Sequence, residues 1–315
     1  MKTVITAILA AALITAIPAW STEPQPAASA QPATKGLRIF SLVHSMAGRF
    51  LDTCLGQIAR SAGYTGHTQL GQDGVGRSKV MQHWNRPGVQ EIIQSGSVDV
   101  LISMGVYPPD PGPEMFAELG AKSNPNFRMT FMEMWIPFDV YEPGFFTGQN
   151  PLPSPKGVDH DAVPFEQLRK DSTRYWQEWD DLINGVNKKL GRQVVFVVPA
   201  GQAALKLREL IIAGKAPGLT SQNDIFKRDG TGRAGPHPDL PLATLMSYCH
   251  YAVIYRKSPV GLPVPEAFKL SRNSKNDDPK TLEALNHLLQ ELAWDAVIHH
   301  PLSGVKAETA VPAAK

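Results

Sequence analysis

The sequence has few of the features that define several common protein classes. Only two cysteines are present, which is too few for a disulfide-based scaffold or a cysteine-ligated metal site. Cys54 and Cys249 lie on apolar faces of predicted helices, so a disulfide and two buried free thiols both stay open. The formal net charge is +2 without a basic block, and nothing points to nucleic acid. Internal repeats and heptads are absent.

Cofactor and metal motifs are also missing. The glycine-rich segment 71–78 lacks the order Gly-x-Gly-x-x-Gly, so a dinucleotide site is not indicated. The nine histidines show no metal-ligand spacing on one helix. We therefore expect neither a metal ion nor a cofactor.

The N-terminus has the pattern of a secretory signal, residues 1–21. Lys2 precedes an apolar run from Val4 to Pro18, and small residues lead to a cleavage site after Ser21. The run is shorter than the roughly 20 apolar residues of a spanning helix, which favours cleavage over anchoring. Residues 22–36 have the composition of a flexible linker, and 302–315 that of a flexible tail. We expect a secreted or periplasmic protein without a membrane span after cleavage.

The segment 37–301 predicts an α/β fold. Short apolar stretches typical of strands occur at Leu37–Val43, Thr68–Leu70, Asp99–Ser103, Arg128–Trp135 and Gln193–Pro199. Helical periodicity predicts helices at Ser45–Ala62, Pro87–Gly96, Glu114–Lys122, Phe165–Leu190, Gln202–Ala213, Leu242–Tyr255 and Pro279–His299. This alternation indicates a parallel sheet of about five strands with helices on both faces.

A long segment at 139–163 interrupts this alternation. It is rich in proline and glycine and has no periodicity. A segment of this kind is either a lid beside a functional site or a solvent loop without a role, and both interpretations stay open.

Ser45 is the first candidate for a catalytic residue. It follows the first predicted strand and precedes the first predicted helix, where open α/β sheets carry their reactive groups. Its own backbone N–H would lie at the start of a helix, where free amide groups and the helix dipole favour a negative charge. The alternative is that Ser45 only caps the helix.

A histidine late in the chain completes a possible nucleophile and base. His237 lies in a Gly/Pro-rich segment that we expect to be a loop, and a histidine can accept the proton of a serine nucleophile. Asp229 or Asp224 would orient His237, and Asp239 would cap the following helix.

The segment after the second strand offers a further set of candidates. Gly74 and Gly76 let the backbone approach a ligand closely and present N–H groups to it. Ser78 is a rival nucleophile that lacks the strand-to-helix setting. His83 and Trp84 suit a sugar ring if they are exposed, although a buried Trp anchor is an equally good interpretation.

These blocks together resemble the SGNH (GDSL-like) hydrolase superfamily, in particular a branch of secreted bacterial SGNH-like proteins. The resemblance rests on His44-Ser45, on Gly76-Arg77-Ser78 with Gln82-His83-Trp84, and on Gly235-Pro236-His237-Pro238 with the segment 248–263. It implies a three-layer α/β/α, flavodoxin-like doubly wound fold. It also implies a Ser45 nucleophile, a His237 base and an oxyanion hole formed by Ser45, Gly74 and Gly76.

The sequence departs from the family pattern at three positions. His44 stands where the family has an aspartate, Gly105-Val106-Tyr107-Pro108 lacks the Gly-x-Asn-Asp asparagine, and Ala234 replaces the usual aspartate before the histidine. The resemblance makes Asp229 the partner of His237 and suggests that His44, His83 and Trp84 bind substrate. We expect an esterase that removes acyl, in particular acetyl, groups from carbohydrate. The alternative is a weak or inactive SGNH-like protein that binds carbohydrate.

Overall fold

The structure is a computed structural model that describes residues 35–140, 157–228, 232–269 and 278–306. The expected signal peptide, nearly all of the expected linker and most of the expected tail lie outside the described residues. The same holds for Asp229 and for residues 141–156 of the possible lid.

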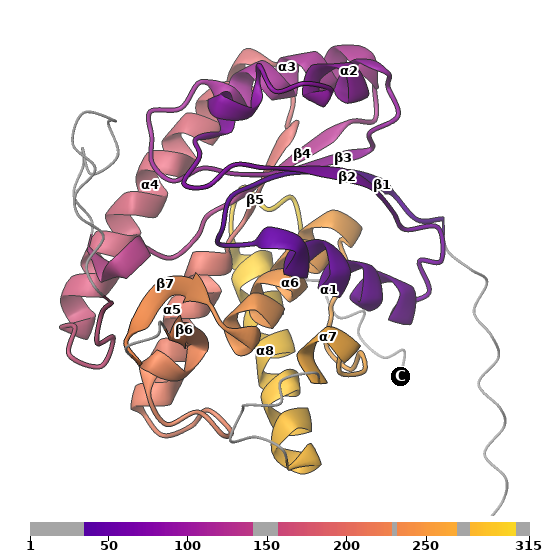
Figure 1. The fold of residues 1–315 in the computed structure, drawn as a ribbon. Helices are drawn as coiled ribbons and strands as arrows, with labels where there is room; N and C mark the ends of the chain where they lie inside the picture. The colour runs from indigo at the N-terminus through magenta and orange to yellow at the C-terminus, as the bar shows by residue number, and fades with distance from the viewer. Residues whose placement is uncertain (1–34, 141–156, 229–231, 270–277, 307–315) are drawn as a thin grey trace, which may run out of the picture. The chain divides into compact units, whose positions relative to one another are not determined.

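A five-stranded sheet lies at the centre of the fold (Figure 1). Its strands pair in parallel in the order β2-β1-β3-β4-β5. They are β1 (Arg38–Val43), β2 (Thr68–Gly74), β3 (Val100–Met104), β4 (Arg128–Met132) and β5 (Val195–Val198). Every residue of β3 and β5 is buried, as the near-continuous apolar runs predict for a sheet covered on both faces.

Helices cover both faces of this sheet, which confirms the predicted three-layer α/β/α fold (Figure 1). One face carries α2 (Val89–Gln94), α3 (Gly112–Ser123) and α4 (Phe165–Lys189). The other face carries α1 (Gly48–Ser61), α5 (Ala200–Ile212), α6 (Leu240–Tyr255), α7 (Glu266–Lys269) and α8 (Pro279–His299). The short 3₁₀ helices are η1 (Val80–His83), η2 (Pro137–Asp139) and η3 (Gln222–Ile225).

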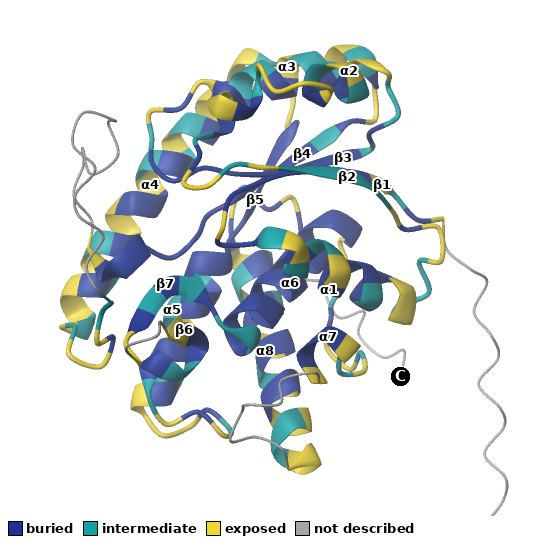
Figure 2. Ribbon diagram, viewed as in Figure 1, coloured by how far each residue is buried: buried dark blue, intermediate teal, exposed yellow. Residues whose placement is uncertain are grey.

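Helix α6 forms the centre of the second helical layer. It packs against α1, α5 and α8, and its residues from Pro241 to Tyr255 are all buried (Figure 2). A helix that is apolar on every side needs such surroundings. None of the helices in the described part of the chain is both long and apolar enough to cross a bilayer.

Both cysteines belong to this packed layer. Cys54 on α1 and Cys249 on α6 are buried and unpaired. The structure therefore shows the second of the two possibilities that the sequence leaves open, two buried free thiols.

The segment around His237 differs from the predicted loop. The strands β6 (Phe226–Arg228) and β7 (Ala234–Pro238) form a two-stranded antiparallel sheet. Pro236 and Pro238 made this segment look irregular in the sequence. A two-stranded ribbon has only edge strands, where proline does not interrupt a ladder. His237 is thus held on a strand.

Candidate active site

Ser45 and His237 meet at the carboxyl end of β1. The Ser45 Oγ lies 2.9 Å from the His237 Nε2, although 192 positions separate the two residues in the sequence. Ser45 is exposed and His237 is half-buried. A serine within hydrogen-bond distance of an imidazole, open to solvent, is the arrangement required for nucleophilic catalysis.

The local backbone explains why Ser45 is free to make this contact. Helix α1 begins only at Gly48, three residues later than the sequence predicts. A tight turn precedes it, in which the backbone N–H groups of Ala47 and Gly48 donate to the His44 carbonyl. Ala47 occupies the N-cap position without a side-chain cap. The Ser45 hydroxyl is therefore not a helix cap, and its contact with His237 lies beyond the helix end.

Two hydrogen bonds fix the strand that carries His237. The Trp135 indole N–H donates to the Pro236 carbonyl at 2.9 Å. The His160 Nε2 lies 3.2 Å from the Gly235 carbonyl. Both contacts act on the two residues that precede His237, so they set the path of β7 where it approaches Ser45.

His160 is part of a buried ionic network with Asp139 and Arg208. The Arg208 guanidinium makes a bidentate pair with the Asp139 carboxylate, with N–O distances of 2.6 and 2.8 Å, and also donates to Gln222. The His160 Nδ1 donates to the same carboxylate at 2.7 Å. The His160 ring stacks on Phe226 of β6 with the ring centroids 3.9 Å apart. All three charged or titratable side chains are at most 2% exposed, so this network is sealed from solvent.

The charges around His237 favour its neutral form. Burial lowers the pKa of His237, and the cationic Lys227 and Arg77 lower it further. His44 is also neutral, because burial together with His83 and His237 lowers its pKa to about 3. A neutral imidazole is the form that accepts a proton.

A second serine–histidine pair lies nearby but is closed to solvent. The Ser78 Oγ lies 2.9 Å from the His83 Nε2, and the His83 Nδ1 donates to the Asp73 carboxylate at 2.6 Å. Arg86 also donates to Asp73. Ser78 and His83 are fully buried. The three residues have the connectivity of a catalytic triad, yet a substrate has no access to Ser78, so they fix the segment 73–83.

The glycines of this segment face open space. A Cβ atom added to Gly74 or Gly76 would meet no atom within 4 Å, and neither residue has a positive φ. Neither backbone strain nor packing therefore explains these glycines. Within the described part of the chain, no hydrogen bond engages the N–H of Gly76 or of Ser45. This pattern is typical of a backbone that is left accessible to a ligand.

Two of the three residues expected to bind substrate are buried. His44 and His83 are buried, and His83 is occupied by Ser78 and Asp73. Trp84 is partly buried and packs edge-to-face on Phe116 of α3, with the centroids 5.0 Å apart. The burial of His44 and His83 leaves neither ring open as a sugar-binding surface. Trp84 is only partly buried, so its role in substrate binding stays a prediction.

The candidate carboxylates for His237 do not reach it in the described residues. Asp224 accepts hydrogen bonds from the backbone of Thr220 and Ser221 and so closes the turn before η3. Asp239 is the N-cap residue of α6 but makes no side-chain cap there. Asp229 lies outside the described residues, so its pairing with His237 stays a prediction.

Sequence reasoning missed the residues that position His237. Asp139, His160 and Arg208 are far apart in the sequence, and each alone is typical of a surface position. One signal was available, because Arg208 falls on the buried face of the predicted helix 202–213, where an arginine needs a partner.

Comparisons with known proteins add information on the fold. No protein-family model matches the chain, and no curated protein matches it. Among solved structures, a DUF4886 family protein from Bacteroides uniformis is similar at a TM-score of 0.52 and 10% identity, over 84% of this chain and 96% of that one. A phospholipase A1 from Streptomyces albidoflavus is 11% identical at a TM-score of 0.39, over 70% and 98% of the two chains. The first likeness shows a shared fold only, and the second is too distant to carry an argument.

Proposed function

We propose that this protein is an SGNH-like serine hydrolase that cleaves carboxylic esters, with Ser45 as the nucleophile and His237 as the general base. The observation that carries the proposal is the 2.9 Å separation of the Ser45 Oγ and the His237 Nε2 at the carboxyl end of β1. The neutral His237 ring, kept so by burial and two cations, is ready to accept the serine proton.

The reaction follows from this pair. The Ser45 Oγ attacks the ester carbonyl carbon while its proton moves to the His237 Nε2. The tetrahedral intermediate collapses, and the alcohol leaves with that proton. Water then attacks the Ser45 acyl ester while His237 accepts a proton from the water. His237 returns that proton to the departing Ser45 Oγ, and the acid is released.

The oxyanion needs donors that are in place before the reaction begins. We assign this role to the backbone N–H groups of Ser45, Gly74 and Gly76. Open space beside both glycines supports the assignment. The positive charges of Arg77 and Lys227 also favour a negative oxygen at this place.

The substrate class rests on the resemblance of the sequence to the SGNH superfamily. We propose an acylated, in particular an acetylated, carbohydrate as the substrate and a secreted or periplasmic location. Because His44 and His83 are buried and Trp84 is only partly buried, Trp84 is the one of these three residues that we propose to contact the sugar.

A non-catalytic, carbohydrate-binding protein on the same fold is the second candidate. It is favoured by the segment Gly105-Val106-Tyr107-Pro108, which offers no asparagine as an oxyanion donor. It is also favoured by His237, whose Nδ1 meets no carboxylate among the described residues. Loss of one such donor lowers a rate by on the order of 100-fold or more.

A fluorophosphonate probe tests the proposal, because it reacts covalently with an activated serine. We expect stoichiometric labelling of the native protein, with the label on the peptide that contains Ser45. The variant Ser45→Ala should not react. Absence of labelling in a folded protein that still binds acetylated oligosaccharide would favour the second candidate.

Ser78→Ala is the matched control for this experiment. Ser78 has the same 2.9 Å contact with a histidine as Ser45, but it is fully buried. The variant should therefore be labelled like the native protein. Labelling that disappears in Ser78→Ala and persists in Ser45→Ala would overturn the assignment of the nucleophile.

The pH dependence of hydrolysis should depend on the cations that lower the pKa of His237. The base is active when it is neutral. Because the pKa of His237 is lowered, kcat/KM should stay high down to a pH below the ordinary histidine pKa of about 6.5. Removing a nearby cation favours the protonated ring, so Lys227→Gln should shift the acidic limb to higher pH. Lys215 is exposed and is not one of the cations that lower the pKa of His237, so Lys215→Gln should leave the limb unshifted. An acidic limb that Lys227→Gln leaves in place would exclude this electrostatic role.

A further inference from the structure

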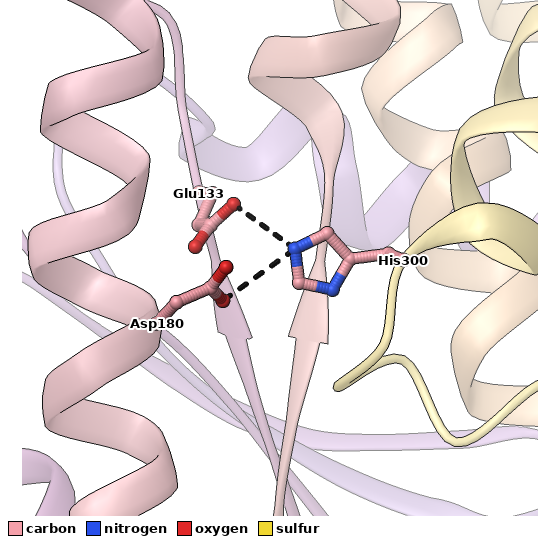
Figure 3. A group of neighbouring side chains, drawn as sticks. All are labelled: Glu133, Asp180 and His300. Carbon is pink, nitrogen blue, oxygen red and sulfur yellow. Dashed lines mark ion pairs between the residues drawn. The ribbon is translucent and has the colours of Figure 1, made fainter.

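Three titratable side chains that are far from each other in the sequence converge beside β5 (Figure 3). Ser45 and His237 do not belong to this cluster. Glu133 directly follows β4, Asp180 lies on α4, and His300 directly follows α8. One ligand atom from each residue lies within 4.8 Å of the others. Figure 3 shows both carboxyl groups turned toward the His300 ring.

The backbone around the cluster is held firmly. The Glu133 N–H donates to the Val198 carbonyl of β5, and the Gly201 N–H donates to the Glu133 carbonyl at 2.7 Å. The Val197 N–H donates to the Leu302 carbonyl, which fixes the chain next to His300. The three side chains therefore start from a preorganised scaffold.

The two distances from His300 to the carboxyl groups suit ligands of one ion better than hydrogen bonds. The His300 Nε2 lies 3.5 Å from a carboxylate oxygen of Glu133 and 3.5 Å from one of Asp180. Hydrogen bonds of this type are usually shorter than about 3.2 Å. Two ligand atoms of a tetrahedral ion with bonds of about 2.1 Å lie about 3.4 Å apart.

Several buried polar atoms of the cluster have no partner. Glu133 is fully buried, and its Oε1 accepts no hydrogen bond within the described part of the chain. The same is true of the Asp180 Oδ1 and of the Oε1 of Gln202, whose amide nitrogen contacts Glu133. No lysine or arginine among the described residues forms an ion pair with Glu133 or Asp180. Buried acceptors of this kind need a donor, a shared proton or a cation.

We propose that Glu133, Asp180 and His300 bind one divalent transition-metal ion, Zn²⁺ or Mn²⁺. Two carboxylates and one imidazole are a ligand set suited to these ions, since imidazole disfavours Mg²⁺ and Ca²⁺. Three protein ligands leave one coordination position for water. The Asp180 side chain is 23% exposed, which gives an ion a path from solvent. The bound ion joins α4, the end of β4 and the segment after α8.

Binding of the ion changes the tautomer of His300. The Nδ1 accepts a hydrogen bond of 3.3 Å from the Leu302 N–H, so without the ion the ring proton is on Nε2, between the two carboxyl groups. The ion takes the place of that proton, the proton moves to Nδ1, and the contact with Leu302 opens. Both carboxyl groups bind as carboxylates, and any proton that they share is released to solvent.

Isothermal titration of the chelator-treated full chain with Zn²⁺ and with Mn²⁺ tests the site. We expect one ion per chain, a melting temperature that rises with ion concentration, and affinity lowered by on the order of 100-fold or more in Glu133→Gln and in His300→Gln. Circular dichroism establishes that each variant is folded. If one of these variants is not folded, Asp180→Asn, which changes the partly exposed ligand, replaces it.

The double variant His287→Gln, His299→Gln is the matched control. These two exposed histidines pair with Glu291 and Asp295 and offer ions a surface site. The control should bind as the native protein does. The site is excluded if folded native protein binds neither ion at about 1 mM, or if only the control loses binding. These readouts do not involve ester hydrolysis, so they are independent of the proposed function.

Discussion

Ser45→Ala should lower kcat for hydrolysis of an activated acetyl ester, such as p-nitrophenyl acetate, by on the order of 10³-fold or more. Ser45 is exposed at the carboxyl end of β1, and its Oγ lies 2.9 Å from the His237 Nε2. Alanine removes the atom that forms the acyl ester. What remains is the rate that backbone donors and the positive charge of the site provide.

His237→Ala should have an effect of similar size, and the two effects should not add. A nucleophile and its base act as one unit, so the double variant should be about as slow as either single variant. Ser78→Ala controls for disturbance of the neighbouring segment, because it removes the buried contact with His83. We expect that variant to change kcat by less than about tenfold. Losses that multiply in the double variant would show that Ser45 and His237 act separately.

The sheet and the position of Ser45 were predictable because local patterns determine them. The apolar run before Ser45 identifies β1, and the periodic residues of 165–190 identify α4, whose Trp176 and Trp179 are buried in the structure. Side-chain periodicity carries this information without knowledge of the tertiary structure. The exact start of α1 was not predictable, since the turn depends on the His44 carbonyl and not on a capping side chain.

The surroundings of the site were harder to predict. His83 and Trp84 have the composition of a ligand surface, but only the three-dimensional packing shows that His83 is buried and bonded to Asp73 and that Trp84 packs on Phe116. The ionic network behind His160 depends on contacts between distant segments, which a single sequence does not reveal. The same is true of Glu133, Asp180 and His300, whose spacing matches no metal motif.

Arg208→Met should destabilise the fold by about 3–5 kcal/mol, the usual cost of breaking a buried ion pair by removing one partner. Arg208 and Asp139 are 2% and 1% exposed, so Arg208→Met would leave the Asp139 carboxyl group in a sealed environment with His160 as its remaining charged or titratable partner. Burial opposes the ionisation of Asp139, but the hydrogen bonds of His160 and Arg208 lower its pKa overall.

The measurement for Arg208 is chemical denaturation of four proteins at neutral pH: the native chain, Arg208→Met, Asp139→Asn and the double variant. Asp139→Asn removes the charge that Arg208→Met leaves unpaired, so the double variant should lose less than the sum of the single losses. Arg169→Met, which breaks an exposed pair with Glu209, should cost no more than about 1 kcal/mol. Additive losses would mean that the pair does not act as a unit.

Because His160 links Asp139 to the Gly235 carbonyl, Arg208→Met should also lower kcat for ester hydrolysis at temperatures where the variant is still folded. That joint effect would connect the stability of the network to the position of His237, and a destabilised variant with native kcat would separate the two.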